Sequence, residues 1–127
     1  MQNATPHFKW REFYCPKAKM CIVNDLTLHH IERLEELRVL LDRPLRVNSA
    51  YRSPEHNKAV GGAVRSMHLQ FATDIAPVGE ITMDKLDEIA QAAERIEFSG
   101  IGRYNSFVHL DCRSYVGRKP ARWDKRR

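Results

Sequence analysis

The sequence predicts a single α+β domain in which a small antiparallel sheet is flanked by helices. Two segments carry apolar residues at three- and four-residue steps, as amphipathic helices do. Short strand-like runs are interspersed with these segments, and the last two runs flank an Asn-Ser pair, which indicates an antiparallel hairpin. The length of 127 residues is enough for one core without stapling disulfides.

The first helix is predicted over residues 27–41. Asn24 or Asp25 can cap its start, and Pro44 ends it. A short alternating run, residues 45–49, then reads as a strand. The apolar stripe that should face the core consists of Leu28, Ile31, Leu34, Leu37 and Leu41.

A short second helix is expected to follow, with Ser53 as its N-cap and Pro54 at its first position. It should end at Gly61 and Gly62, where glycine accepts a left-handed backbone. A third helix is predicted over residues 82–97. Its buried face is expected to comprise Met83, Leu86, Ile89, Ala90, Ala93 and Ile96.

Three further strands are predicted from short apolar runs. The first covers residues 72–76, and the other two, residues 100–104 and 107–112, form the hairpin around Asn105 and Ser106. Helices and antiparallel strands in mixed order are typical of α+β domains.

The chain is basic, with a net charge of +5 and a pI of about 9.3. Part of this excess lies in residues 118–127. We expect one domain over 1–127, with an N-terminal segment at 1–24 and a basic C-terminal tail at 114–127. A basic balance favours nucleic acid, a membrane surface or an anionic wall polymer, while a simpler interpretation is a solvated tail that aids solubility.

The sequence disfavours membrane insertion, nucleic-acid binding and secretion by a signal peptide. No apolar run of about 18 residues exists, so membrane insertion is not expected. No nucleic-acid reader motif or clustered aromatic platform is visible, which argues against a nucleic-acid-binding protein. The polar, aromatic N-terminus carries no secretory signal, so the protein is expected to be cytoplasmic when made.

The three cysteines, Cys15, Cys21 and Cys112, are an odd number and define no disulfide framework. Cys15 and Cys21 are separated by five residues, which is wider than the spacing of a zinc knuckle. We interpret them as reduced thiols, with a structural pair near the N-terminus as the alternative.

The last predicted strand carries the first candidate site. Its alternation places Val108, Leu110 and Cys112 on the core side, so His109 and Asp111 share the opposite face. An imidazole and a carboxylate side by side on a rigid strand suit a metal site or acid–base chemistry. A plain surface pair is the alternative.

A second candidate cluster precedes and enters the strand at 72–76. Asp74 lies among apolar neighbours, where a carboxylate is unfavourable unless a metal ion, a buried arginine or backbone amides compensate it. His68 lies in the loop before it. Together with His109 they offer three nitrogen and oxygen ligands, as a catalytic zinc site with an open fourth position requires. Bound zinc lowers the pKa of its water to about 7 and polarises a carbonyl, as amide hydrolysis needs.

The order and spacing of six blocks over residues 45–113 resemble the zinc D-alanyl-D-alanine carboxypeptidase family. That family includes phage endolysins, vancomycin-resistance dipeptidases and murein endopeptidases, and it shares its fold with the hedgehog signalling domain. A further segment at residues 8–15 resembles the start of its small phage and bacterial members. The six blocks are Ser49-Ala50-Tyr51-Arg52-Ser53-Pro54, Val60-Gly61-Gly62-Ala63, Ser66-x-His68, Ala72-Thr73-Asp74-Ile75, Gly100-Ile101-Gly102-x-Tyr104 and Phe107-Val108-His109-Leu110-Asp111.

The resemblance implies a role for each matching residue. His68, Asp74 and His109 match the family's zinc ligands, and Arg52 matches an arginine used near substrate, with a structural ion pair as its alternative role. The implied function is zinc-dependent hydrolysis of peptidoglycan stem peptides or cross-links, as a carboxypeptidase or an endopeptidase. We expect a monomer whose partner is bacterial peptidoglycan. The protein would reach the cell wall after release from the cell as a lysin, or as part of a virion.

The sequence departs from the family in its metal loop. Asp74 follows His68 by six residues, one fewer than the family uses, and Phe71 stands where a glycine is usual. One residue of chain spans a few ångströms, so the loop must follow a different path or the site is impaired.

The general base also departs from the family. Ser106 occupies the position at which many relatives carry a carboxylate, and it cannot abstract a proton at neutral pH. Asp111 is the preferred substitute, because it shares a face with His109. In the alternative, Asp111 only orients His109. These departures leave a second hypothesis open, a catalytically silent domain that acts as a wall-binding or protein-interaction module.

Overall fold

The structure is a computed structural model that describes residues 2–127. It has three α-helices, seven strands and three short 3-10 turns within that range. The helices are α1 (Asp25–Leu41), α2 (Pro54–Ala59) and α3 (Met83–Arg95). The strands are β1 (Asn3–Thr5), β2 (Phe8–Lys9), β3 (Leu45–Ser49), β4 (Ala72–Pro77), β5 (Gly100–Arg103), β6 (Val108–Asp111) and β7 (Ala121–Asp124). The 3-10 turns are η1 (Trp10–Phe13), η2 (Met67–Leu69) and η3 (Arg113–Val116).

The predicted helices are confirmed, and each starts at a side-chain cap. The Asn24 side chain accepts a hydrogen bond from the backbone N–H of Thr27 at the start of α1. Ser53 caps α2 and Thr82 caps α3 in the same way. After α2 the chain turns at Gly61, whose φ of +71° lies in the left-handed region that glycine accepts.

The main sheet has the strand order β3-β4-β6-β5-β7, and a separate small sheet pairs β1 with β2. The four predicted strands β3, β4, β5 and β6 pair antiparallel, as expected. The fifth strand, β7, pairs parallel to β5, so the main sheet is mixed at this edge. The strands β4 and β6, which carry candidate site residues, lie side by side inside the sheet.

The C-terminal residues 114–127 differ from the solvated tail that was one interpretation of the sequence. They contain most of η3 and all of β7, and ion pairs hold them to α3. Arg122 contacts Glu94 at 2.8 Å and Arg126 contacts Asp87 at 2.8 Å. Two of the tail's basic residues therefore help to fix the last strand.

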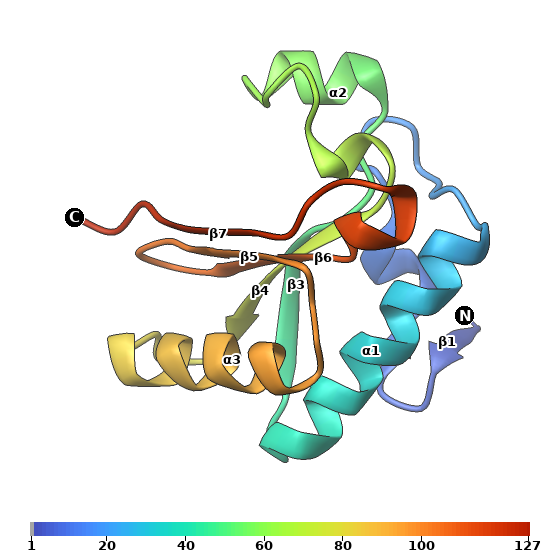
Figure 1. The fold of residues 1–127 in the computed structure, drawn as a ribbon. Helices are drawn as coiled ribbons and strands as arrows, with labels where there is room; N and C mark the ends of the chain where they lie inside the picture. The colour runs from blue at the N-terminus through green and yellow to red at the C-terminus, as the bar shows by residue number, and fades with distance from the viewer. Residues whose placement is uncertain (1) are drawn as a thin grey trace.

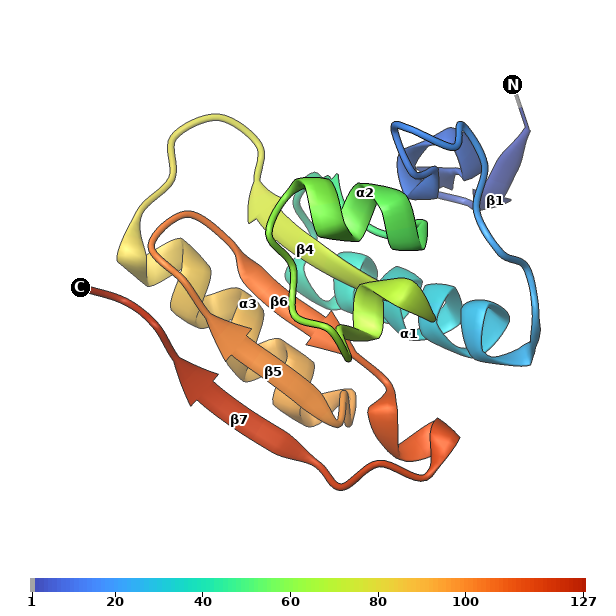
Figure 2. The same ribbon diagram turned by 90° about the horizontal axis from the view of Figure 1, so that it is seen from above.

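Helices cover both faces of the main sheet, as Figures 1 and 2 show. The long helices α1 and α3 lie against one face, and α2 lies over the other face together with η2. The core fills the space between the sheet and the two long helices. Its largest fully buried apolar side chains are Phe8, Phe13, Phe71, Phe98, Leu34, Leu37, Ile75, Ile89, Leu110 and Val108.

Two residues of the predicted apolar stripes are not in the core. Leu28 in α1 and Met83 in α3 are both 43% exposed. The inner position of α1 is taken by His30, which is fully buried and shares a hydrogen bond of 2.9 Å with the Thr73 hydroxyl of β4. The buried face of α1 therefore includes a polar ring that is hydrogen-bonded to β4.

The three cysteines are buried and free in the structure, as reduced thiols would be. Near the N-terminus, Phe13 of η1 packs edge-on against Phe71, with ring centroids 5.7 Å apart.

None of the helices in residues 2–127 is both long enough and apolar enough to span a bilayer.

Candidate metal centre

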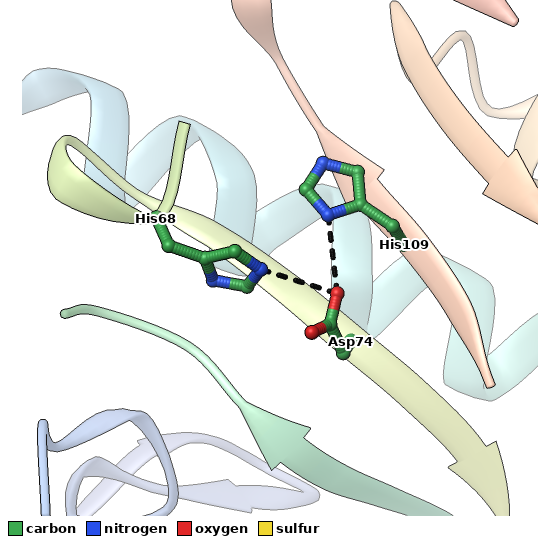
Figure 3. A group of neighbouring side chains, drawn as sticks. All are labelled: His68, Asp74 and His109. Carbon is green, nitrogen blue, oxygen red and sulfur yellow. Dashed lines mark hydrogen bonds and ion pairs between the residues drawn. The ribbon is translucent and has the colours of Figure 1, made fainter. Parts of the chain in front are cut away.

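The structure brings His68, Asp74 and His109 together on the sheet face that α2 covers. Asp74 of β4 lies directly opposite His109 of β6 in the antiparallel register, and η2 delivers His68 just before β4 begins. One ligand atom from each of the three lies within 4.8 Å of the others. Figure 3 shows both imidazole rings pointing at the Asp74 carboxylate.

Hydrogen bonds on the far side of each ring fix which nitrogen faces the cluster. Nδ1 of His68 donates to the Ala50 carbonyl oxygen at 2.6 Å, because a carbonyl can only accept. Nε2 of His109 donates to Oδ2 of Asp111 at 2.7 Å. In the neutral rings, Nε2 of His68 and Nδ1 of His109 therefore carry lone pairs, and these face Oδ1 of Asp74 at 3.2 and 3.1 Å.

Three electron-pair donors thus converge on one point. Two lone pairs and a carboxylate oxygen repel one another unless protons or a metal ion lie between them. Burial raises the pKa of Asp74, but when the His109 and His68 rings carry a proton on the facing nitrogen, the hydrogen bonds they donate outweigh burial and hold that pKa well below its ordinary value. Burial lowers the pKa of His109, while Asp111 and Asp74 raise it further than burial lowers it. Two imidazole nitrogens and one carboxylate oxygen are a donor set that fits zinc with an open fourth position.

The shortened metal loop keeps the three ligands together. The 3-10 turn η2 compacts the chain after Ser66, whose hydroxyl accepts a hydrogen bond from the His68 N–H at 3.1 Å. Phe71, in place of the usual glycine, points into the core and is fully buried against Phe13 and His30. With six residues from His68 to Asp74, the chain still brings the ligand atoms of His68, Asp74 and His109 within 4.8 Å of one another.

Asp111 lies behind His109, on the side away from Asp74. It has no exposed surface, and both of its oxygens are held by Arg113, through Nε to Oδ1 at 2.9 Å and Nη2 to Oδ2 at 2.7 Å. Burial raises the pKa of Asp111, yet hydrogen bonds from His109 and Arg113 hold it well below its ordinary value. The preferred sequence interpretation made Asp111 the general base, whereas this geometry favours the alternative in which it orients His109.

Arg52 lies beside the cluster. Its Nη2 is 3.9 Å from Oδ2 of Asp74, and its Nη1 donates to Oδ1 of Asn57 at 3.2 Å. A side chain at Gly62 would overlap both Asn57 and Arg52, so this glycine makes room for the pair. Ser106, by contrast, is exposed and lines a separate hollow with Arg46.

The cluster opens into a cleft of about 400 Å³. A volume of this size is typical of ligand-binding pockets. Asp74 is the only carboxylate among the residues that line it, within residues 2–127. Four arginines and three aromatic side chains line the same cleft, namely Arg52, Arg65, Arg113, Arg118, Tyr104, Phe107 and Trp123.

The residues that β7 contributes to the site were not predicted from the sequence. The indole of Trp123 lies 5.2 Å from the His109 ring between centroids, and its Nε1 donates to the Tyr104 hydroxyl at 2.9 Å. Arg113 stacks over the same indole at 5.1 Å. Any side chain at Gly102 would collide with Trp123. A glycine inside a strand often marks a close approach of another part of the chain, so Gly102 was the one feature of the sequence that could have indicated a neighbour such as Trp123.

An α+β domain with a buried His-Asp-His cluster at the base of an open cleft has the site of a metal-dependent hydrolase. A comparison with protein-family models gives the family: the Peptidase M15 model matches residues 6–111, so the chain belongs to the Peptidase M15 family. Peptidases of this family are metal-dependent. The match includes the three clustered residues and Asp111, and it ends before Arg113 and β7. A comparison with curated proteins found no match.

Proposed function

We propose that the protein is a zinc peptidase that hydrolyses peptidoglycan stem peptides or their cross-links. The observation that carries the proposal is the convergence of the His68, Asp74 and His109 donor atoms within 4.8 Å, at the base of a cleft. Membership of the Peptidase M15 family supports the peptidase activity. The cell-wall substrate rests on the sequence resemblance to peptidoglycan carboxypeptidases and endolysins.

His68, Asp74 and His109 would hold the metal through Nε2, a carboxylate oxygen and Nδ1, respectively. Bound there, zinc supplies an activated water and a Lewis acid for the scissile carbonyl. The Ala50 carbonyl and Asp111 keep each imidazole in the tautomer that presents a lone pair to the metal. Trp123 covers His109 from the β7 side and shields it from solvent.

Arg52 is the side chain best placed to act on substrate. Its guanidinium lies within 3.9 Å of the Asp74 carboxylate and lines the cleft. Asn57 and Ser49 hold it in position through Nη1 and Nε. A fixed guanidinium beside the metal can stabilise the oxyanion that develops during attack on a peptide carbonyl.

One observation favours a second candidate, a family member that binds wall peptide without cutting it. The cleft contains no carboxylate apart from Asp74 among the described residues, and Asp111 is fully enclosed by His109 and Arg113. A general base within reach of the attacking water usually contributes about 100-fold or more to the rate. Its absence would leave a binding domain with an intact metal site.

Digestion of purified peptidoglycan separates the two candidates. Chelator-free protein is first analysed for metal, and the wild type and an Asp74→Asn variant are then incubated with sacculi and with soluble stem peptides. We expect about one zinc per wild-type chain, new peptide ends by mass spectrometry, and neither from the variant. Zinc without new ends would favour the binding domain, and the absence of both would refute the proposal. The masses of the fragments identify the cleaved bond.

A further inference from the structure

We propose that Arg65 and Arg118 form a carboxylate-binding subsite at the rim of the cleft, which recognises a free carboxylate of the substrate peptide. This inference rests on the proposed function, because it gives the cleft an acidic peptide as substrate. It adds two residues that neither the sequence analysis nor the metal cluster assigned a role.

The two arginines come from two separate segments that both line the cleft. Arg65 lies in the loop between α2 and η2, and Arg118 lies between η3 and β7. Nη1 of Arg118 donates to the backbone carbonyl of Arg65 at 3.1 Å, which joins the two segments. That bond leaves the Arg65 guanidinium and the other nitrogens of Arg118 free to contact a ligand.

Neither guanidinium has an acidic partner in residues 2–127. The cleft's other two arginines do have one, because Arg113 pairs with Asp111 and Arg52 approaches Asp74. Burial and the neighbouring guanidinium groups of Arg113 and Arg65 lower the pKa of Arg118, and Asp111 opposes part of this lowering. Unpaired like charges in a concave site are unfavourable, and an anion placed between them relieves the repulsion.

The chemistry of this rim favours a carboxylate on a peptide. A guanidinium presents a planar fork that matches a carboxylate through two parallel hydrogen bonds. Tyr104 and Phe107 stack on each other at 4.4 Å and line the same cleft, so they offer an apolar surface for the rest of the peptide. A substrate held across the cleft would thus place one carboxylate at the rim and its scissile carbonyl near Arg52 and the metal cluster.

Three matched peptides test the subsite. The parent is the stem pentapeptide L-Ala-γ-D-Glu-L-Lys-D-Ala-D-Ala, and in the two analogues either the D-Glu α-carboxyl or the C-terminal carboxyl is replaced by a carboxamide. Binding is measured by calorimetry on metal-free wild type, Arg65→Gln and Arg118→Gln, and kcat/KM on the zinc-loaded forms. Arg46→Gln, an exposed arginine of β3 outside the cleft, is the control.

We expect one of the two amidated peptides to bind the wild type about tenfold more weakly than the parent, which corresponds to about 1.4 kcal/mol. Arg65→Gln and Arg118→Gln should bind the parent peptide more weakly than the wild type does, by a similar factor. Neither variant should bind that amidated peptide more weakly than the wild type does, because the substrate charge that the arginine would contact is already absent. Arg46→Gln should behave as wild type. Arg65→Gln should fold as the wild type does, because the Arg65 side chain makes no hydrogen bond to a described residue. A loss of binding in this variant would therefore not be explained by misfolding.

The result that overturns the subsite is equal binding of all three peptides by the wild type, or variants that discriminate among them as the wild type does. Cleavage of all three at equal kcat/KM would leave the proposed peptidase function standing and refute the subsite. Arginine-dependent binding without cleavage of any peptide would support the subsite and refute the peptidase function.

Discussion

Asp111 and Asp74 contact opposite nitrogens of the His109 ring. Its Oδ2 accepts a hydrogen bond from Nε2 of His109 at 2.7 Å, and the opposite nitrogen, Nδ1, faces Asp74 at 3.1 Å. The carboxylate therefore lies on the far side of the imidazole from the metal cluster. A group in this position sets the tautomer and orientation of a ligand histidine without reaching the substrate.

Asp111→Asn should weaken zinc binding by about 10- to 100-fold, because the imidazole loses the charged acceptor that fixes its tautomer. Zinc affinity is measured by competition with a chelator of known strength. Arg113→Gln is a matched variant: it removes the second partner of the same carboxylate and should weaken zinc binding less. Unchanged zinc affinity in Asp111→Asn, with turnover abolished, would instead establish Asp111 as the general base.

Zinc should stabilise the folded protein through the three clustered residues. With free zinc about 100-fold above its Kd, the free energy of unfolding should rise by about 2.7 kcal/mol and the thermal midpoint should rise with it. His68→Ala and His109→Ala should abolish the rise. His29→Ala, which removes a ring stacked on Tyr115 away from the cluster, should retain it. A rise that persists in both ligand variants would place the metal elsewhere.

Gly102→Ala should displace Trp123, because the added methyl group would overlap the indole. Overpacking of this kind costs about 1–3 kcal/mol of stability. In a Trp10→Phe background the remaining indole reports its own environment by fluorescence, and we expect a red shift. Gly79→Ala is the control: its φ of +86° makes alanine strained, yet nothing lies near its side chain, so Trp123 emission should not change. Unaltered emission in Gly102→Ala would contradict the packing.

His30 should make the protein less stable as the pH falls below neutrality. Burial lowers the pKa of His30 to about 3, whereas in the unfolded chain it returns to about 6.5. Between these values the unfolded state binds a proton that the folded state does not, so stability is lost as the pH falls from about 6.5 towards about 3. The loss attributable to His30 should be about 2 kcal/mol at pH 5.

Urea unfolding of the wild type and His30→Gln at pH 7.5 and pH 5 measures this contribution. The variant should lose about 2 kcal/mol less than the wild type between the two pH values, whatever its stability at pH 7.5. Equal losses would mean that His30 titrates normally in the folded state.

Local signals in the sequence predicted most of the fold. Helix caps at Asn24 and Ser53 marked where two helices begin, and strand alternation placed His109 and Asp111 on one face. These features depend on residues close together in the chain, so they are visible without the tertiary structure.

The features that could not be predicted depend on distant contacts. The residues of β7 carry arginine and aspartate at alternate positions, and the strand forms because β5 offers an edge and α3 offers ion-pair partners such as Glu94. The same strand brings Trp123 to His109, and Arg113 after β6 encloses Asp111. Alternation alone gave the correct face for Asp111 without showing what would cover it.

X-ray absorption at the zinc edge of the loaded protein tests the metal centre most directly. If His68, Asp74 and His109 hold the ion, the spectrum should show two imidazole nitrogens and oxygen ligands at about 2.0–2.2 Å, with one zinc per chain. A shell of sulfur at about 2.3 Å would assign the metal to cysteine thiolates and contradict the account, as would the absence of bound zinc.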